Sequence, residues 1–175
     1  MIDMENSIIE IVAYRPEHQP WFEKFNRDWI EKFFWMEPLD FEILQNPDVN
    51  IIGKGGEIFM AYYQKEIAGT VALKFVESGV YEFTKMAVDE KFQGKKIGEM
   101  LAQVAIQQAK HHQAKKIILY SNTKLKAAIS LYRKLGFVEI ELDGPYKRSD
   151  IKMELSLAPK AAKIISFKSG IIGLL

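Results

Sequence analysis

One stretch, residues 81–137, constrains the fold of this chain more than any other. A strand pattern over 80–88 leads into a short polar loop, 89–96. Apolar residues then recur at the spacing of one helix face, at Ile97, Leu101, Val104, Ala105 and Ala109. A short apolar run at 117–120 is typical of a buried strand, and a second amphipathic helix follows it, ended by Gly136. Strand, helix and strand in this order predict a right-handed crossover between parallel strands.

The loop before the first of these helices has the composition of an anion site. A helix N-terminus leaves backbone N–H groups unpaired and carries partial positive charge. Gly94 and Gly98 allow close approach to the backbone, and Lys95 and Lys96 add charge. These features suit a phosphate or pyrophosphate, although an ordinary turn with solvated lysines has the same composition. A P-loop and a Rossmann fingerprint are excluded, because the Gly-Lys-Ser/Thr ending and the three-glycine spacing are absent.

Residues 81–137 resemble the GNAT superfamily of N-acetyltransferases. That family carries a loop of Arg or Gln, two residues, Gly, one residue, and Gly or Ala. Gln93, Ile97 and Gly98 fit this pattern, but Lys96 stands where the first Gly is usual. We expect Lys96 to be already helical, where it adds charge near phosphate, rather than to adopt a positive φ. The similarity continues through Ser121-Asn122-Thr123 and through the helix end Leu131-Tyr132-Arg133-Lys134-Leu135-Gly136-Phe137.

The rest of the chain completes an α/β (α+β) pattern. We expect strands at 7–14, 58–63, 67–75, 137–142 and 150–157, and a short helix at 40–44. Phe22, Phe25, Trp29 and Phe33 recur at helical spacing, which predicts a helix that packs on the sheet and partly walls a substrate cleft. The order predicts a mixed, mostly antiparallel central sheet flanked by helices. The resemblance implies one GNAT-like domain over 1–157.

The resemblance also implies which residues bind acetyl-CoA. Gln93, Gly94, Lys95, Lys96, Ile97 and Gly98 would hold the pyrophosphate. Met86 and Val88 would run beside pantetheine, with the Val88 N–H as the oxyanion donor, although an ordinary core strand has the same pattern. Asn122 would bind a pantetheine amide or, equally, cap a helix. Tyr132 would give a proton to the departing thiolate; on residues alone it is a core tyrosine.

Glu82 is the candidate base. Strand alternation predicts that it shares a face with Thr84, Met86 and Val88. A carboxylate among apolar strand residues is costly unless it has a partner or a chemical task. Related enzymes often place a base there that acts through water, so catalysis and a structural partner are equally supported.

Other polar residues are weaker candidates. Tyr146, Arg148 and Asp150 lie beside the last loop, where an acceptor could dock, but we predict a solvated turn. Glu37 and Asp40 would attract a cationic amine or cap a short helix. His111 and His112 are adjacent on a helix, so they point apart and make no metal pair. We expect no metal.

The composition of the chain limits the kinds of binding partner and the cellular location that we expect. The 175 residues carry a formal net charge of +1, which gives no reason to expect nucleic acid or an anionic membrane. With no cysteine, disulfides and a cysteine acyl-enzyme are excluded, which fits a cytoplasmic protein. We expect no signal peptide and no membrane span. The tail at 158–175 is apolar, and for residues 159–175 we expect docking on protein, with a possible homodimer.

The resemblance therefore implies an N-acetyltransferase. Acetyl-CoA would be the cosubstrate, and a primary amine on a small molecule or peptide would attack it directly. The alternative from another class is a non-catalytic domain that binds acyl-CoA as a sensor or interaction module. Both need the loop, and only the enzyme needs Tyr132 and a usable base.

Overall fold

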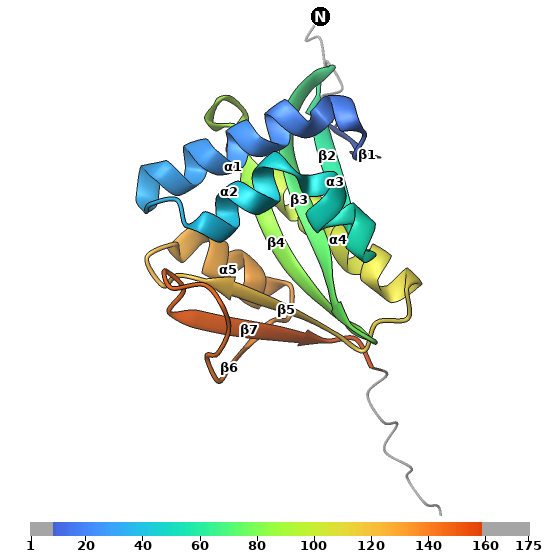
Figure 1. The fold of residues 1–175 in the computed structure, drawn as a ribbon, viewed down its shortest axis with the longest axis vertical. Coiled ribbons are helices and arrows are strands. Elements are labelled where there is room, and N and C mark those ends of the chain that lie inside the picture. The colour runs from blue at the N-terminus through green and yellow to red at the C-terminus, as the bar shows by residue number, and fades with distance from the viewer. Residues whose placement is uncertain (1–8, 159–175) are drawn as a thin grey trace, which may run out of the picture.

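The computed structural model describes residues 9–158. Within this range, seven strands form one sheet. Its strands are β1 (Ile9–Ala13), β2 (Glu57–Tyr63), β3 (Glu66–Glu77), β4 (Val80–Val88), β5 (Lys116–Ser121), β6 (Val138–Ile140) and β7 (Ile151–Ser156). They lie in the order β1-β2-β3-β4-β5-β7-β6 (Figure 1). Every neighbouring pair is antiparallel except β4 and β5, which are parallel. The predicted mixed, mostly antiparallel sheet is confirmed.

Helices cover both faces of this sheet (Figure 1). They are α1 (Gln19–Phe33), α2 (Pro38–Gln45), α3 (Pro47–Asn50), α4 (Ile97–His111) and α5 (Lys126–Lys134). The described residues also include three short 3₁₀ helices, η1 (Pro16–His18), η2 (Ile52–Lys54) and η3 (Glu90–Phe92). The sequence analysis did not predict α3; Pro47 ends α2 but also stands at the first position of a new helical turn, where its missing N–H costs nothing.

The core has two parts, one on each face of the sheet. The larger part joins the sheet to α4 and α5 through buried residues such as Leu101, Ile117 and Tyr132. The smaller part joins it to α1, α2 and the segment after them, around Phe22 and Leu44. The aromatic spacing of α1 therefore does mark a packing face, as predicted, although Phe33 at its end is 46% exposed.

The parallel pair β4–β5 is unusually short. Its register covers only Val80 with Lys116, Tyr81 with Ile117, and Glu82 with Ile118. Beyond Glu82, β4 continues for six residues along β3, whereas β5 turns away along β7. Figure 1 shows the two strands close at one end and spread apart at the other. The sheet therefore opens in its middle, on the carboxyl side of both strands.

A bulge in β4 lies beside this opening. Thr84 pairs with Ala72 and Ala87 with Thr70, so β4 has one extra residue against β3. Lys85 accommodates it with a φ of 52°, a conformation that non-glycine residues rarely adopt. The extra residue reverses the alternation. Met86 and Val88 consequently pack in the core with Tyr81 and Phe83, not on the face of Glu82, and our predicted face for them was wrong.

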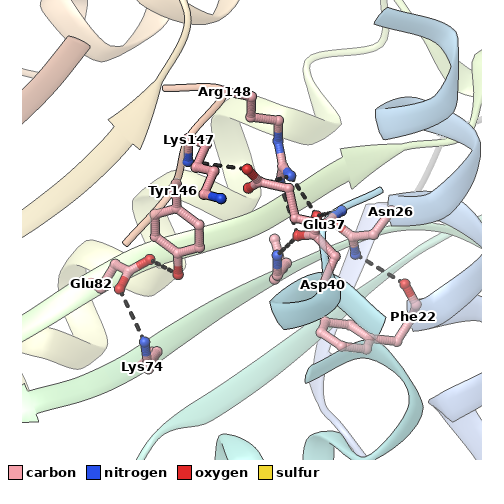
Figure 2. A network of polar contacts seen from close by, with 10 residues as sticks. Phe22, Asn26, Glu37, Asp40, Lys74, Glu82, Tyr146, Lys147 and Arg148 are labelled. Carbon is pink, nitrogen blue, oxygen red and sulfur yellow. Dashed lines mark hydrogen bonds and ion pairs between the residues drawn. The ribbon is translucent and has the colours of Figure 1, made fainter. Parts of the chain in front are cut away.

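A buried ion cluster ties α2 to β4 and to the loop before β7. Lys85 Nζ donates to Asp40 Oδ1 at 2.7 Å, and Arg148 donates to both Asp40 oxygens, with Nη2 2.9 Å from Oδ1. Arg148 Nη1 also lies 3.0 Å from Glu37 Oε2, and the Lys147 N–H donates to Glu37 Oε1 at 3.1 Å. Figure 2 shows Arg148 reaching between the two carboxylates. Two acids and two bases thus compensate one another away from water.

The cluster keeps Asp40 ionised. Burial alone would raise the pKa of Asp40, but hydrogen bonds from Arg148 and the charge of Lys85 hold it at about 2. A depressed carboxyl pKa contributes stability that is complete above the unfolded value and is lost as pH falls through the folded value. Burial lowers the pKa of Lys85, and Asp40 opposes that shift.

The described residues include no helix long and apolar enough to cross a membrane. The apolar tail at 159–175 and its expected docking lie outside the residues that the structure describes.

Removing the arginine from the buried cluster should destabilise the fold. We expect Arg148→Met to lower the free energy of unfolding by roughly 3–5 kcal/mol, because Glu37 and Asp40 would lose a buried partner. Lys116→Met is the matched control, since it breaks a pair with Glu154 that is much more open to solvent and should cost less than about 1 kcal/mol. Urea denaturation of both variants measures this, and equal losses would contradict a special role for the cluster.

Candidate active site

A cavity of about 310 Å³ lies where β4 and β5 part. It receives residues from helices on opposite faces of the sheet: Asn26, Trp29 and Ile30 from α1, and Ala127, Ala128, Leu131 and Tyr132 from α5. Both strands that border the opening line it, from Glu82 to Val88 and from Tyr120 to Asn122. The loop before β7 adds Tyr146, Arg148 and Ser149. The cavity therefore joins the two faces of the sheet through the opening.

The Val88 N–H points into this opening. Its neighbour Asp89 donates its N–H to Ala68 O at 2.9 Å, on the β3 side. Successive N–H groups of a strand point to opposite edges, so the Val88 N–H faces away from β3. Because β5 stops pairing with β4 at Glu82, no strand accepts from this group. A donor of this kind suits an oxygen that gains negative charge.

The loop from Gln93 to Lys96 is exposed and leads into α4. No side chain caps that helix, so its first N–H groups remain available to an anion. Lys96 has φ 62° and ψ 16°, which is left-handed, so our expectation that it would be helical was wrong. The left-handed backbone explains why the family usually has Gly at this position, since Gly adopts a positive φ without strain. Lys96 adopts the same conformation at an energetic cost.

Gly98 has a different role from a turn glycine. Its φ is not positive, and a Cβ built on it would meet only Val88 Cγ2, at 3.8 Å. Neither backbone conformation nor packing within the described residues thus requires glycine there. The side chain of Ile97 is buried in the core, and it anchors the start of α4 below the loop. The absence of a side chain at Gly98 leaves room for a ligand near Val88.

Asn122 is neither a free amide nor the N-cap of α5. Its Oδ1 accepts from the Lys124 N–H at 3.0 Å, and its Nδ2 donates to Arg148 O at 2.8 Å. The N-cap of α5 is Leu125. Asn122 therefore ties the segment after β5 to the loop before β7, while its side chain still lines the cavity.

Tyr132 lies between the core and the cavity. Its ring contacts Phe83 and Phe137 edge-on, and the residue is 9% exposed. Burial raises the pKa of Tyr132 to about 12, and nothing within residues 9–158 hydrogen-bonds to the hydroxyl. The hydroxyl is nevertheless not fully enclosed, since Tyr132 lines the cavity. Tyr132 is thus a core residue whose protonated hydroxyl group a ligand in the cavity can reach.

Glu82 has structural partners at the point where the strands part. Tyr146 donates its hydroxyl to Glu82 Oε1 at 2.7 Å, and Lys74 Nζ lies 3.4 Å from Oε2 (Figure 2). Burial, with the charge of Glu82, raises the pKa of Tyr146, which therefore stays protonated and donates. Glu82 is 4% exposed yet lines the cavity. A carboxylate held in this way can also accept a proton from a ligand.

The loop before β7 is not the solvated turn that we predicted. Tyr146 is 9% exposed, its ring lies 5.2 Å from that of Tyr120, and Arg148 belongs to the buried cluster. The sequence analysis also missed Lys85, although a lysine inside an apolar strand was a usable signal. Glu37 and Asp40 do belong to the start of α2, but they bind Arg148 rather than an amine.

Metal ligands do not gather in the described part of the chain. Within residues 9–158, no group of three or more His, Asp or Glu side chains is placed to hold an ion. His112 stacks on Tyr81, and its Nε2 lies 3.2 Å from Glu57 Oε2. It follows the carboxyl end of α4, whereas the loop from Gln93 to Lys96 precedes the amino end.

Three solved acetyltransferases have the same fold as this chain. A GNAT-family acetyltransferase from Staphylococcus aureus Mu50 has a TM-score of 0.78 at 23% identity, with 86% of this chain and 99% of that chain covered. The PaiA N-acetyltransferase from Thermoplasma acidophilum, solved with coenzyme A, has a TM-score of 0.69 at 20% identity, covering 85% and 99%. The ribosomal-protein-S18-alanine N-acetyltransferase from Escherichia coli gives 0.68 at 20% identity, covering 91% and 100%.

Sequence comparison agrees with the fold. No curated protein matches the chain. Residues 13–137, more than half of the chain, match the model of the acetyltransferase (GNAT) family. This range contains α1, β4, β5 and α5, which supply most of the cavity lining, and the loop from Gln93 to Lys96 that leads into α4. The chain therefore belongs to the acetyltransferase (GNAT) family.

Proposed function

We propose that this protein transfers the acetyl group of acetyl-CoA to a primary amine by direct attack. The observation that carries the proposal is the cavity through the opened sheet. It brings Gln93, at the beginning of the loop that leads to the uncapped start of α4, together with Val88, Tyr132 and Glu82. The pyrophosphate would bind at residues 93–98, and the pantetheine arm would pass Met86 and Val88 on the α5 side. Asn122 would support this arm indirectly, because its hydrogen bond to Arg148 O holds the loop before β7 against the cavity.

The reaction needs a bond exchange at the carbonyl carbon. The amine nitrogen, arriving from the α1 side, forms a bond to the acetyl carbon, and the bond to sulfur then breaks. Negative charge develops on the carbonyl oxygen, and the Val88 N–H is placed to donate to it. The opening in the sheet is what allows the two substrates to meet from opposite faces.

Two protons must move. Tyr132 would protonate the departing thiolate, since its raised pKa of about 12 keeps the hydroxyl protonated at neutral pH. Glu82 would accept the proton that the amine loses, directly or through water, and Tyr146 and Lys74 hold it in place. A cytoplasmic location would supply acetyl-CoA. The alternative, a sensor that binds acyl-CoA without turnover, uses the same loop and makes no use of Tyr132.

Substituting Gly98 should separate binding from folding. We expect Gly98→Asp to weaken acetyl-CoA binding by about tenfold or more, roughly 1.4 kcal/mol, because the new carboxylate places negative charge where the pyrophosphate would bind. The thermal midpoint should stay nearly the same, since the protein has space for a Cβ at this position and an acid suits the first turn of a helix. Calorimetric titration measures this, with the exposed Gln103→Ala in the same helix as control. Unchanged binding would place the pyrophosphate elsewhere.

Tyr132 distinguishes the enzyme from the sensor. Tyr132→Phe should lower kcat by roughly 10²–10⁴-fold, the range for a positioned acid, while acetyl-CoA affinity stays nearly intact. Release of CoA thiol reports the rate. Tyr62→Phe is the control, because the Tyr62 hydroxyl contacts His18 and Tyr62 does not line the cavity. A variant with wild-type kcat would return Tyr132 to a packing role.

Glu82 should control the acid limb of the pH profile. A base that receives the ammonium proton gives a fall in kcat/KM at low pH, and Glu82→Gln should remove or shift this limb. The amide keeps the size of the side chain and can still accept from Tyr146, so circular dichroism should show an intact fold. If the limb stays in place, the proton leaves by another route.

A further inference from the structure

The acceptor side of the cavity has aromatic walls. Trp29 and Phe34 line it from α1 and the residue after it, with ring centroids 6.2 Å apart. Tyr146 lines it from the opposite direction, and Ile30 and Leu125 add aliphatic surface. Both Trp29 and Phe34 are only partly buried, so they present apolar surface that a ligand could cover.

Two of the three charged groups that line this cavity already have close ionic partners. Among the described residues, those that line it are Glu82, Lys85 and Arg148. Lys85 and Arg148 are bound to Asp40, and Arg148 also to Glu37. Glu82 contacts Lys74 only at 3.4 Å and accepts one hydrogen bond from Tyr146. One carboxylate is therefore available for one amine, and no second carboxylate is available for a second ammonium group.

The hollow next to the cavity has acids of its own. It shares Trp29, Val88 and Gln93 with the cavity, and its lining includes four acids: Asp28, Glu31, Asp89 and Glu90. Asp28 is paired with Lys24 and Glu90 with Lys32, whereas Glu31 and Asp89 form no ion pair within the described residues. None of the four lines the cavity that holds Glu82, so a second ammonium group next to the reacting nitrogen would still lack a carboxylate.

The cavity is also small. Its 310 Å³ lies at the lower end of the range of ligand sites, roughly 300–1,000 Å³. The acetylated pantetheine arm would take part of this space. What remains suits a compact apolar group next to the amine, of the size of one ring or one branched alkyl chain.

We infer that the acceptor is a primary amine whose adjacent group is apolar, aromatic or branched aliphatic, and which carries no second positive charge near the reacting nitrogen. This rests on the proposed function and specifies its substrate. The amine lies against Glu82, and the apolar group packs between Trp29 and Phe34. A free monoamine and the N-terminal residue of a polypeptide share this chemistry.

An amine panel tests the inference on the full-length protein. Phenethylamine and isoamylamine represent apolar monoamines, cadaverine and spermidine represent polyamines, and methylamine lacks the apolar group. Tetrapeptides that begin with Phe or Asp test the polypeptide source. We expect the apolar monoamine, or the Phe peptide, to exceed its polar counterpart in kcat/KM by roughly 10–200-fold, the discrimination of a hydrophobic pocket. Preference for methylamine or a polyamine would overturn the inference and leave the proposed function intact, whereas no acetylation of any amine would overturn both.

Variants locate the apolar group. Trp29→Ala should raise the KM for phenethylamine about tenfold and leave the KM for acetyl-CoA within about twofold. Trp21→Ala is the matched control, because Trp21 lies on the same helix, is 42% exposed and does not line the cavity. Phe34→Leu keeps an apolar side chain without the ring, so it should lower the preference for phenethylamine over isoamylamine even if Trp29→Ala fails to fold. Unchanged preference in Phe34→Leu together with unchanged KM in Trp29→Ala would refute the proposed walls.

Discussion

The short pairing between β4 and β5 determines where the cavity lies. Backbone N–H and C=O groups inside a sheet normally find partners on both sides, and leaving them unpaired is costly. Here the ladder ends at Glu82 and Ile118, so the far half of β4 keeps donors directed at open space. The helices on either face then supply walls rather than filling the gap. A missing set of ladder bonds has left a cavity in the middle of the sheet, and we propose that the two substrates meet there.

Much of the architecture could be predicted because it is local. The spacing from Ile97 to Ala109, the apolar run of β5 and the polar loop before α4 each report on neighbouring residues. The GNAT motif, the mixed sheet and the helical faces followed from them. Lys96 shows the limit of this approach. The motif marked the departure from Gly, but only the backbone shows that the position is left-handed.

The buried ion cluster could not be predicted in the same way. Glu37, Asp40 and Arg148 look like surface charges when each is considered with its neighbours. Their burial depends on partners 45 and 108 residues away, which no local pattern reveals. The bulge at Lys85 is part of the same problem, because it directs the lysine toward α2 and moves Met86 to the other face. Tyr146 was misjudged for the same reason, since its partner Glu82 lies 64 residues earlier.

The long reach of this cluster bears on the order in which the chain assembles. Contacts between distant residues form slowly, because a large loop must close before they are made. Asp40 cannot be neutralised fully until the segment carrying Arg148 arrives, 108 residues later. We therefore expect α2 to dock firmly only after β7 has joined the sheet. During synthesis, the part of the site that we propose for acetyl-CoA would take shape before the part that we propose for the amine.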